Sequence, residues 1–170
     1  MFHIVLVHPE IPPNTGNIAR TCAATACHLH LIEPLGFELS DRYLKRGGMD
    51  YWKHLEWTVW PDWNAFVQAE ETPKNLWYVE SDGPTRYDQA PFQPGDGLVF
   101  GCETKGLPPK MVRDAKDRWV RIPMIHPTSR SLNLSNSVAL VLYEALRQQG
   151  FSDERPVVPE TQLPANGADS

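Results

Sequence analysis

Three polar segments of the chain contain the residue types that bind or transform small ligands. The first, residues 12–20, follows an apolar run and contains Arg20, whose guanidinium can hold a phosphate through two parallel hydrogen bonds. The second, residues 98–108, places Glu103 between two glycines that let a ligand approach the backbone closely. The third, residues 121–137, is rich in Ser and Asn, and a loop of this kind can hydrogen-bond the edge of an adenine and a ribose.

Each segment also has a purely structural interpretation. Asn14 or Thr15 can cap a helix that begins near residue 15, and Glu103 can belong to an ordinary tight turn. The Ser and Asn side chains of residues 129–137 can cap the helix that follows, although they are more numerous than one cap needs. From the residue types alone, a ligand site and a set of capping turns both stay open.

Several common catalytic and nucleotide-binding signatures are absent. Residues 101–106 have the glycine spacing of a phosphate-binding loop, but Leu107 and Pro108 stand where that loop requires Lys and Ser or Thr. No G-x-G-x-x-G follows the first apolar run, no H-E-x-x-H occurs, and the three cysteines form no C-x-x-C pair. His28 and His30 lie on one face of an expected strand, where we favour a structural role. We therefore expect neither a dinucleotide-dependent oxidoreductase nor a metal site.

Short apolar runs alternate with helical patterns along the chain, which predicts an α/β domain with a mostly parallel sheet flanked by helices. In the last expected helix Leu134, Val138 and Val141 belong to one apolar stripe, and Gly150 marks its end. Residues 82–97, rich in Gly, Pro and Asp, are expected to form a loop. The expected strands are residues 3–7, 29–32, 55–60, 76–79, 98–100 and 119–122, and the expected helices are residues 15–25, 40–46, 61–70, 108–115 and 134–149.

The length of 170 residues suits one domain, and the formal net charge of −5 argues against a protein that coats nucleic acid by bulk charge. The charge is segregated, because residues 105–130 carry seven bases and two acids. This basic run is either an ordinary solvated surface or a local site for an anionic ligand. Residues 1–151 are expected to form the domain, and residues 152–170 a mobile tail. With no signal sequence and no long apolar span, a soluble, cytoplasmic protein is expected.

The motifs, taken in order along the chain, resemble the SPOUT superfamily of RNA methyltransferases. The match is close to its tRNA ribose 2′-O-methyltransferase branch, whose members modify a cytidine or uridine at the wobble position. The matching segments are residues 10–20, 30–37, 48–51, 101–108 and 129–143, and the resemblance extends over residues 2–151. Cys102 and residues 126–128 depart from the pattern of that family.

The resemblance implies an α/β fold whose C-terminal part is tied in a trefoil knot, with S-adenosyl-L-methionine bound in the knot. It also implies a homodimer with active sites at the subunit interface. The implied cofactor-binding residues are Val79, Gly101, Ile122, Met124 and Ser131, and the implied catalytic residues are Asn14, Arg20, Glu103, Ser131 and Asn133.

The implied reaction moves the cofactor's methyl group to the ribose 2′-OH of nucleotide 34 of tRNA, with leucine isoacceptors as substrates. We interpret Arg20 as a clamp on the phosphate and the developing alkoxide, because a guanidinium does not readily lose a proton. Glu103 is expected to orient Arg20 or Asn14 rather than act as a base. A methyltransferase acting at another RNA site and a non-catalytic RNA-binding dimer are the alternatives. Three further residues could contact the RNA or the partner subunit, or be ordinary surface residues: Arg130, Tyr143 and Arg147.

Overall fold

The computed structural model describes residues 1–39, 54–113, 115–152 and 154–155. The helix expected at 40–46, the motif at 48–51 and most of the expected tail lie outside the described residues. The strands are β1 (His3–Val7), β2 (His28–Ile32), β3 (Trp57–Trp60), β4 (Leu76–Val79), β5 (Thr85–Arg86), β6 (Gly97–Phe100) and β7 (Trp119–Arg121). They form one sheet in the order β3-β2-β1-β6-β4-β7-β5, and all neighbouring pairs are parallel. The predicted α/β class with a parallel sheet is confirmed.

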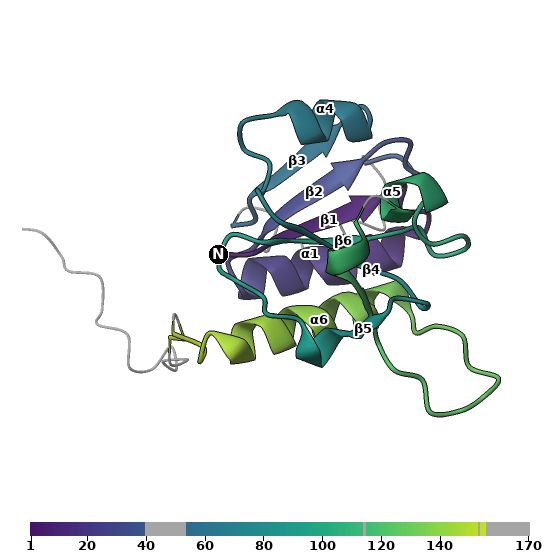
Figure 1. Cartoon of the computed structure of the whole chain (residues 1–170). Helices are drawn as coiled ribbons and strands as arrows, with labels where there is room; N and C mark the ends of the chain where they lie inside the picture. The colour runs from purple at the N-terminus through teal and green to yellow at the C-terminus, as the bar shows by residue number, and fades with distance from the viewer. Residues whose placement is uncertain (40–53, 114, 153, 156–170) are drawn as a thin grey trace, which may run out of the picture.

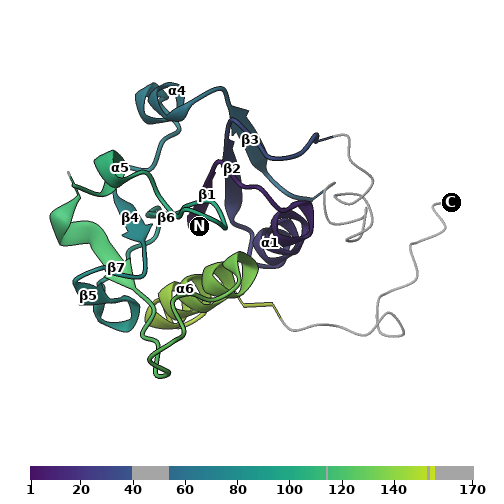
Figure 2. The ribbon, with the colours of Figure 1, turned by 90° about the vertical axis from the view of Figure 1, so that its right-hand side faces the viewer.

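The helices cover both faces of this sheet. They are α1 (Pro12–Ala24), α4 (Trp63–Gln68), α5 (Pro109–Arg113) and α6 (Leu134–Gln148), with short 3₁₀ turns η1 (Tyr87–Gln89) and η2 (Lys116–Arg118). The helices α1 and α6 lie side by side on one face, and α4 and α5 lie on the other (Figures 1 and 2). Within the described ranges, no helix is long and apolar enough to cross a membrane.

The two helical layers explain why β1 is apolar at almost every position. Successive side chains of a strand point to opposite faces, so Ile4 and Leu6 pack in the core cluster that includes residues of α1 and α6. Val5 and Val7 belong to the second cluster, together with Phe66 of α4. A strand buried on both faces needs a continuous apolar run, as parallel strands between helical layers usually have.

The start of α1 differs from the expectation in a way that matters for the site. The helix begins at Pro12, three residues before the expected start, and Ile11 is its N-cap without a side-chain hydrogen bond. Proline suits the first helical positions because its fixed φ is already helical and its missing N–H would have no partner there. The prediction that Asn14 or Thr15 caps this helix is therefore wrong, and the Asn14 side chain is left for another use.

A short strand was missed in the segment expected to be a loop. Residues Thr85–Arg86 form β5, which pairs with Val120 and Arg121 of β7. The Arg121 guanidinium donates to the carbonyl oxygens of Gly83 and Pro84 at 2.7 and 2.6 Å. Two residues are too few to show an alternating pattern, so only this long-range pairing reveals the strand.

The end of α6 agrees with the prediction from Gly150. This residue has φ +67°, the left-handed conformation that glycine adopts at low cost. The Gly150 N–H donates to the Arg147 carbonyl oxygen at 2.9 Å, and the Phe151 N–H donates to the Leu146 carbonyl oxygen at 3.1 Å. This pair of bonds satisfies the last helical carbonyls and ends the helix.

Candidate active site

A cavity of about 450 Å³ lies where the carboxyl ends of β4, β6 and β7 meet the first turns of α1 and α6. This volume is within the range of about 300–1,000 Å³ that is usual for small-ligand sites. Residues from all three polar segments line it, so tertiary folding brings the three segments together. All the residues expected to bind a cofactor are in its wall: Val79, Gly101, Ile122, Met124 and Ser131.

The turn after β6 forms one wall and requires its two glycines. The Gly106 N–H donates to the Cys102 carbonyl oxygen at 3.0 Å, which closes the turn. A Cβ added at Gly101 would lie 2.0 Å from the Gly106 carbonyl carbon, and Gly106 has φ +67°. Both positions therefore exclude larger side chains, because the backbone of the turn and the Glu80 carboxylate occupy the space that a Cβ would need. The close approach of a ligand to these glycines stays a prediction. Cys102 leaves this turn intact.

Glu103, at the tip of that turn, is fully engaged as a hydrogen-bond acceptor. Its Oε2 accepts from the Glu10 N–H at 2.8 Å, and its Oε1 accepts from the Ile11 N–H at 3.2 Å and from Asn14 Nδ2 at 2.9 Å. In return, the Glu10 carboxylate accepts from the Thr104 hydroxyl at 2.9 Å and from the Thr104 N–H at 3.2 Å. The turns that follow β1 and β6 are thus clasped together, and Glu103 orients Asn14, which is one of its two expected roles.

Asn14 extends this network to the third segment. Its Oδ1 accepts from Asn133 Nδ2 at 2.9 Å, and the side chain is only 5% exposed. Asn133 is in turn the N-cap of α6, because its Oδ1 accepts from the Ser135 N–H at 2.9 Å and from the Ser135 hydroxyl at 2.7 Å. The resulting polar relay, Glu103–Asn14–Asn133–Ser135, joins all three polar segments beside the cavity.

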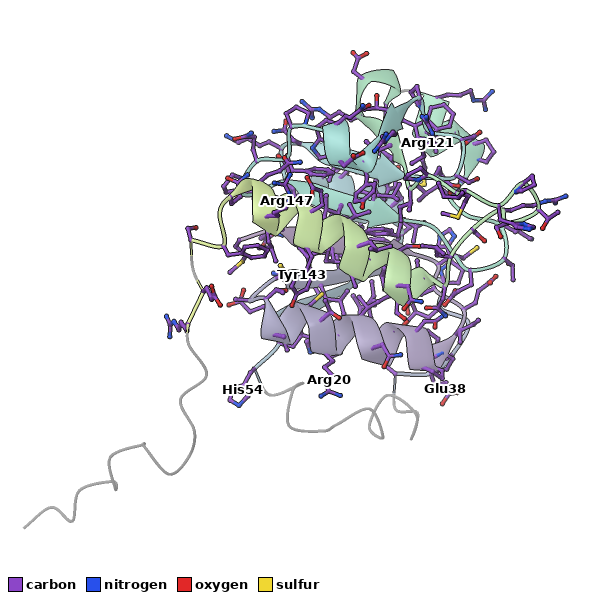
Figure 3. The ribbon with its side chains drawn as sticks, turned by 90° about the horizontal axis from the view of Figure 1, so that it is seen from below. Arg20, Glu38, His54, Arg121, Tyr143 and Arg147 are labelled. Atoms are coloured by element: carbon purple, nitrogen blue, oxygen red, sulfur yellow. The ribbon has the colours of Figure 1, made fainter. Side chains whose placement is uncertain are left out.

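Arg20 is the one expected catalytic residue that does not line this cavity. It lies six residues beyond Asn14 on α1, about 9 Å further along the helix axis at 1.5 Å per residue. Its side chain is exposed and extends away from α6 (Figure 3). Within a single chain, the structure therefore separates Arg20 from the polar relay.

The residues expected to contact RNA or a partner fall into two groups. Arg130 lines the cavity. Tyr143 and Arg147 do not, and they lie on α6, on the side of the molecule where α1 and α6 are neighbours (Figure 3). Tyr143 is 50% exposed, while both Arg147 Nε and Nη2 donate to Glu144 at 2.8 Å.

Glu80, which is not among the residues expected from the sequence, follows Val79 directly and lines the same cavity. Burial raises the pKa of the Glu80 carboxyl, and hydrogen bonds from the Leu107 and Ser81 N–H groups oppose that shift. Its position just after a strand, next to an expected cofactor residue, is the signal that could have identified it.

Among the described residues, His3, His28 and His30 form a cluster that could be considered for a metal ion. The Trp60 indole N–H donates to His30 Nδ1 at 3.1 Å, so Nε2 is the protonated nitrogen and faces His3 Nδ1 at 3.0 Å. A metal would need the lone pair of that same nitrogen. Burial, followed by the neighbouring His28 and His3, lowers the pKa of His30 to about 3. The cluster is a neutral hydrogen-bonded group, which agrees with the structural role favoured for His28 and His30.

Comparisons with known proteins bear on the activity of this site. A tRNA (cytidine(34)-2′-O)-methyltransferase from Burkholderia pseudomallei is 52% identical over 153 residues, which cover 89% of this chain and 97% of that protein. A solved structure concerned with the 2-OH methylation of C/U34 on tRNA is 43% identical with a TM-score of 0.82, covering 89% of this chain and 97% of the other.

A third relative has its cofactor bound. The SpoU methyltransferase AviRb from Streptomyces viridochromogenes, in complex with AdoMet, is 27% identical with a TM-score of 0.75, covering 88% of this chain and 61% of that one. Residues 1–143 of this chain also match the SpoU rRNA Methylase family. The expected family is confirmed, and on this extent of agreement the chain belongs to the SpoU rRNA methylase family of methyltransferases.

Proposed function

We propose that this chain methylates the ribose 2′-OH of nucleotide 34 of tRNA, a cytidine or a modified uridine, with S-adenosyl-L-methionine as methyl donor. The observation that carries this proposal is the 52% identity, over nearly the whole of both chains, to a relative named for cytidine 34. Leucine-accepting tRNAs in the cytoplasm are the proposed substrates. The proposed catalytic domain is residues 1–151, with residues 152–170 as a tail outside it.

The cavity is suited to a nucleoside cofactor. Gly101 and Gly106 line one wall without side chains of their own, and side chains such as Ile122 and Met124 supply apolar surface. When bound, S-adenosyl-L-methionine supplies an electrophilic methyl group on a sulfonium. The proposed binding residues are the five cofactor positions in the wall, and we extend the proposal to the trefoil knot that the family resemblance implies for this part of the chain.

The polar relay is proposed to position the acceptor ribose. Asn14 and Asn133 fix each other's orientation, so any donor or acceptor that they present to the ribose is held in place before the substrate arrives. Glu103 already accepts three hydrogen bonds, which makes it a positioning residue rather than a base. The proton of the 2′-OH would leave to the adjacent phosphate or to water as the new O–C bond forms and the S–C bond breaks.

Arg20 is proposed to act in a homodimer. Because it lies outside the cavity of its own chain, we propose that a site formed by two subunits brings it to the reacting atoms. Exposed apolar side chains on α6 and just beyond its end support such an interface, since Leu140, Tyr143 and Phe151 are 42%, 50% and 41% exposed. In this arrangement Arg20 holds the phosphate and the developing alkoxide in the site of the second subunit.

Mixing subunits tests the shared site. Arg20→Ala and Asn133→Ala homodimers should each be inactive. If Arg20 serves the second subunit, a mixed dimer contains one site with both native residues and recovers activity. If Arg20 serves its own chain, both sites of the mixed dimer carry a defect and activity stays absent, which would overturn the two-subunit site.

The activity itself is tested with labelled S-adenosyl-L-methionine and tRNA from cells that lack the wobble methylation. Digestion should yield a 2′-O-methylated cytidine or uridine derivative from position 34 of leucine tRNAs. Label at another nucleotide of the tRNA would favour a different RNA site. RNA binding without any transfer would favour the non-catalytic dimer.

A further inference from the structure

Glu80 is a half-buried carboxylate in the wall of the cavity, and the proposed mechanism gives it no role. It follows β4 directly, next to Val79, so the same strand end that presents an expected cofactor residue also presents a negative charge. The second carboxylate of the wall, Glu103, has its oxygens occupied by three donors and is not equivalent.

The backbone around Glu80 holds its carboxylate in place. The Leu107 N–H donates to Glu80 Oε1, and the Ser81 N–H is a second backbone donor. A Cβ added at Gly106 would lie 2.3 Å from Oε1 and 2.8 Å from Oε2, so the carboxylate occupies the space that this glycine leaves open. A carboxylate has about four acceptor positions, and two backbone donors leave the others unused.

This carboxylate also lacks a cation. Lys105 and Arg130 line the same cavity, yet neither forms an ion pair with Glu80 among the described residues. Burial removes part of the hydration of this carboxylate, and the raised pKa of Glu80 shows that its backbone donors compensate that loss only in part. A positively charged ligand with hydrogen-bond donors would compensate the charge.

We propose that Glu80 is a cofactor-binding residue, whose carboxylate accepts hydrogen bonds from the donors of a cationic nucleoside cofactor. This inference rests on the proposed function for the identity of that cofactor. S-adenosyl-L-methionine offers three such donor groups, the adenine amino group, the ribose diol and the ammonium, and its sulfonium adds positive charge. Each of these cofactor groups would interact with Glu80 in the same way, as a hydrogen-bond donor or a cation that faces the carboxylate held by the turn after β6.

Ligand affinities measured by calorimetry on the full-length protein distinguish which group of the cofactor contacts Glu80. Glu80→Gln keeps the size and one acceptor oxygen but removes the charge. Asp82→Asn is the matched control, because Asp82 is exposed, lies two residues away and does not line the cavity. The ligands are S-adenosyl-L-methionine, S-adenosyl-L-homocysteine, which lacks the sulfonium charge, and 5′-methylthioadenosine, which lacks the amino-acid end.

Glu80→Gln should weaken S-adenosyl-L-methionine binding about 10- to 100-fold, the effect of losing a hydrogen bond to a charged group, while Asp82→Asn binds normally. Equal losses for all three ligands identify a donor of the adenosine part that they share, the ribose diol or the adenine amino group. Losses for the first two alone identify the ammonium, and a loss for the first alone identifies the sulfonium. Unchanged binding of every ligand, or a fall in kcat with unchanged cofactor affinity, would overturn the proposal.

Two controls keep the result interpretable. If the wild type binds none of the ligands, the proposed function fails. If the wild type and Glu80→Gln both bind with equal affinity, only the role of Glu80 fails. If Glu80→Gln does not fold, the wild type still provides a test. Because the pKa of Glu80 is raised above its usual value of about 4.3, the wild-type affinity for S-adenosyl-L-methionine should fall as the pH is lowered from 8 to about 4 and the carboxylate takes up a proton, and a constant affinity would contradict the assignment.

Discussion

Replacing Asn14 with aspartate changes one atom of the polar relay and reverses the interaction on which the relay depends. Asn14 Nδ2 now donates to Glu103 Oε1 at 2.9 Å, while Asn14 Oδ1 accepts from Asn133. In Asn14→Asp the second contact can persist, but the first becomes an approach of two carboxylate oxygens. The perturbation therefore tests the clasp between the turns after β1 and β6 with almost no change in shape.

The distance between Asn14 Nδ2 and Glu103 Oε1 sets the magnitude of this repulsion. Two negative charges 2.9 Å apart repel each other by about 6 kcal/mol at an effective dielectric constant of about 20. This is comparable to the whole unfolding free energy of many domains, about 5–15 kcal/mol. The folded variant can avoid the repulsion by holding one proton between the two carboxylates.

The sign of the pH dependence follows from that proton. Between pH 5 and 8 the folded variant binds more protons than the unfolded variant, so its unfolding free energy falls as the pH rises. The deficit relative to wild type should grow by up to about 1.4 kcal/mol per pH unit, or about 4 kcal/mol over this range.

Urea unfolding at fixed protein concentration, at pH 5 and pH 8, measures the effect. Asn17→Asp is the matched control, because Asn17 lies on the same helix but is exposed and outside the cavity. The control should stay within about 0.5 kcal/mol of wild type, as surface substitutions usually do. An Asn14→Asp protein as stable as the wild type at pH 8, with normal methyl transfer, would refute the assignment of Asn14 and Glu103 to one clasp.

Three further predictions follow from particular residues. The pKa of His30 is lowered to about 3, while the unfolded value lies near 6.5, so the wild type should lose about 3 kcal/mol of unfolding free energy between pH 7 and 4.5. In denaturant titrations, His30→Gln should reduce this dependence of stability on pH. An unchanged pH dependence in the variant would contradict the role of His30. Gly150→Ala should cost about 1 kcal/mol, since this glycine has φ +67° and open space around it. Gly106→Ala should cost more, since it has the same φ and its Cβ would also displace the Glu80 carboxylate, and of the two it alone should weaken cofactor binding in calorimetry. Arg20→Lys should bind cofactor normally and lose most of its methyl transfer, because lysine cannot form the two parallel hydrogen bonds that a guanidinium donates to a phosphate. Full turnover by this variant would show that these paired bonds are not needed.

Local signals in the sequence were sufficient for most of the fold. The strands at β1 and β4 have the expected bounds, because short β-branched runs between turns indicate buried strands. The end of α6 was equally readable, since Gly150 supplies the left-handed residue that closes the helix. The two-residue β5 could not be read, because its only cause is the pairing with β7.

The candidate site also has features that the sequence determined and features that only tertiary packing decided. The sequence by itself determined the residue types, the two glycines of the turn after β6 and, through the family resemblance, the residues of the cavity wall. Only the tertiary structure decided which side chains meet: Glu103 reaches Asn14 rather than Arg20, and Asn14 joins Asn133 rather than capping its own helix. Hydrogen bonds between residues 89 and 119 positions apart depend on the parallel packing of β1 beside β6 and of α1 beside α6. No local pattern encodes these distances, because they depend on which segments pack together. The environment of the Glu80 carboxylate likewise depends on the turn after β6, which packs against it only in the folded chain.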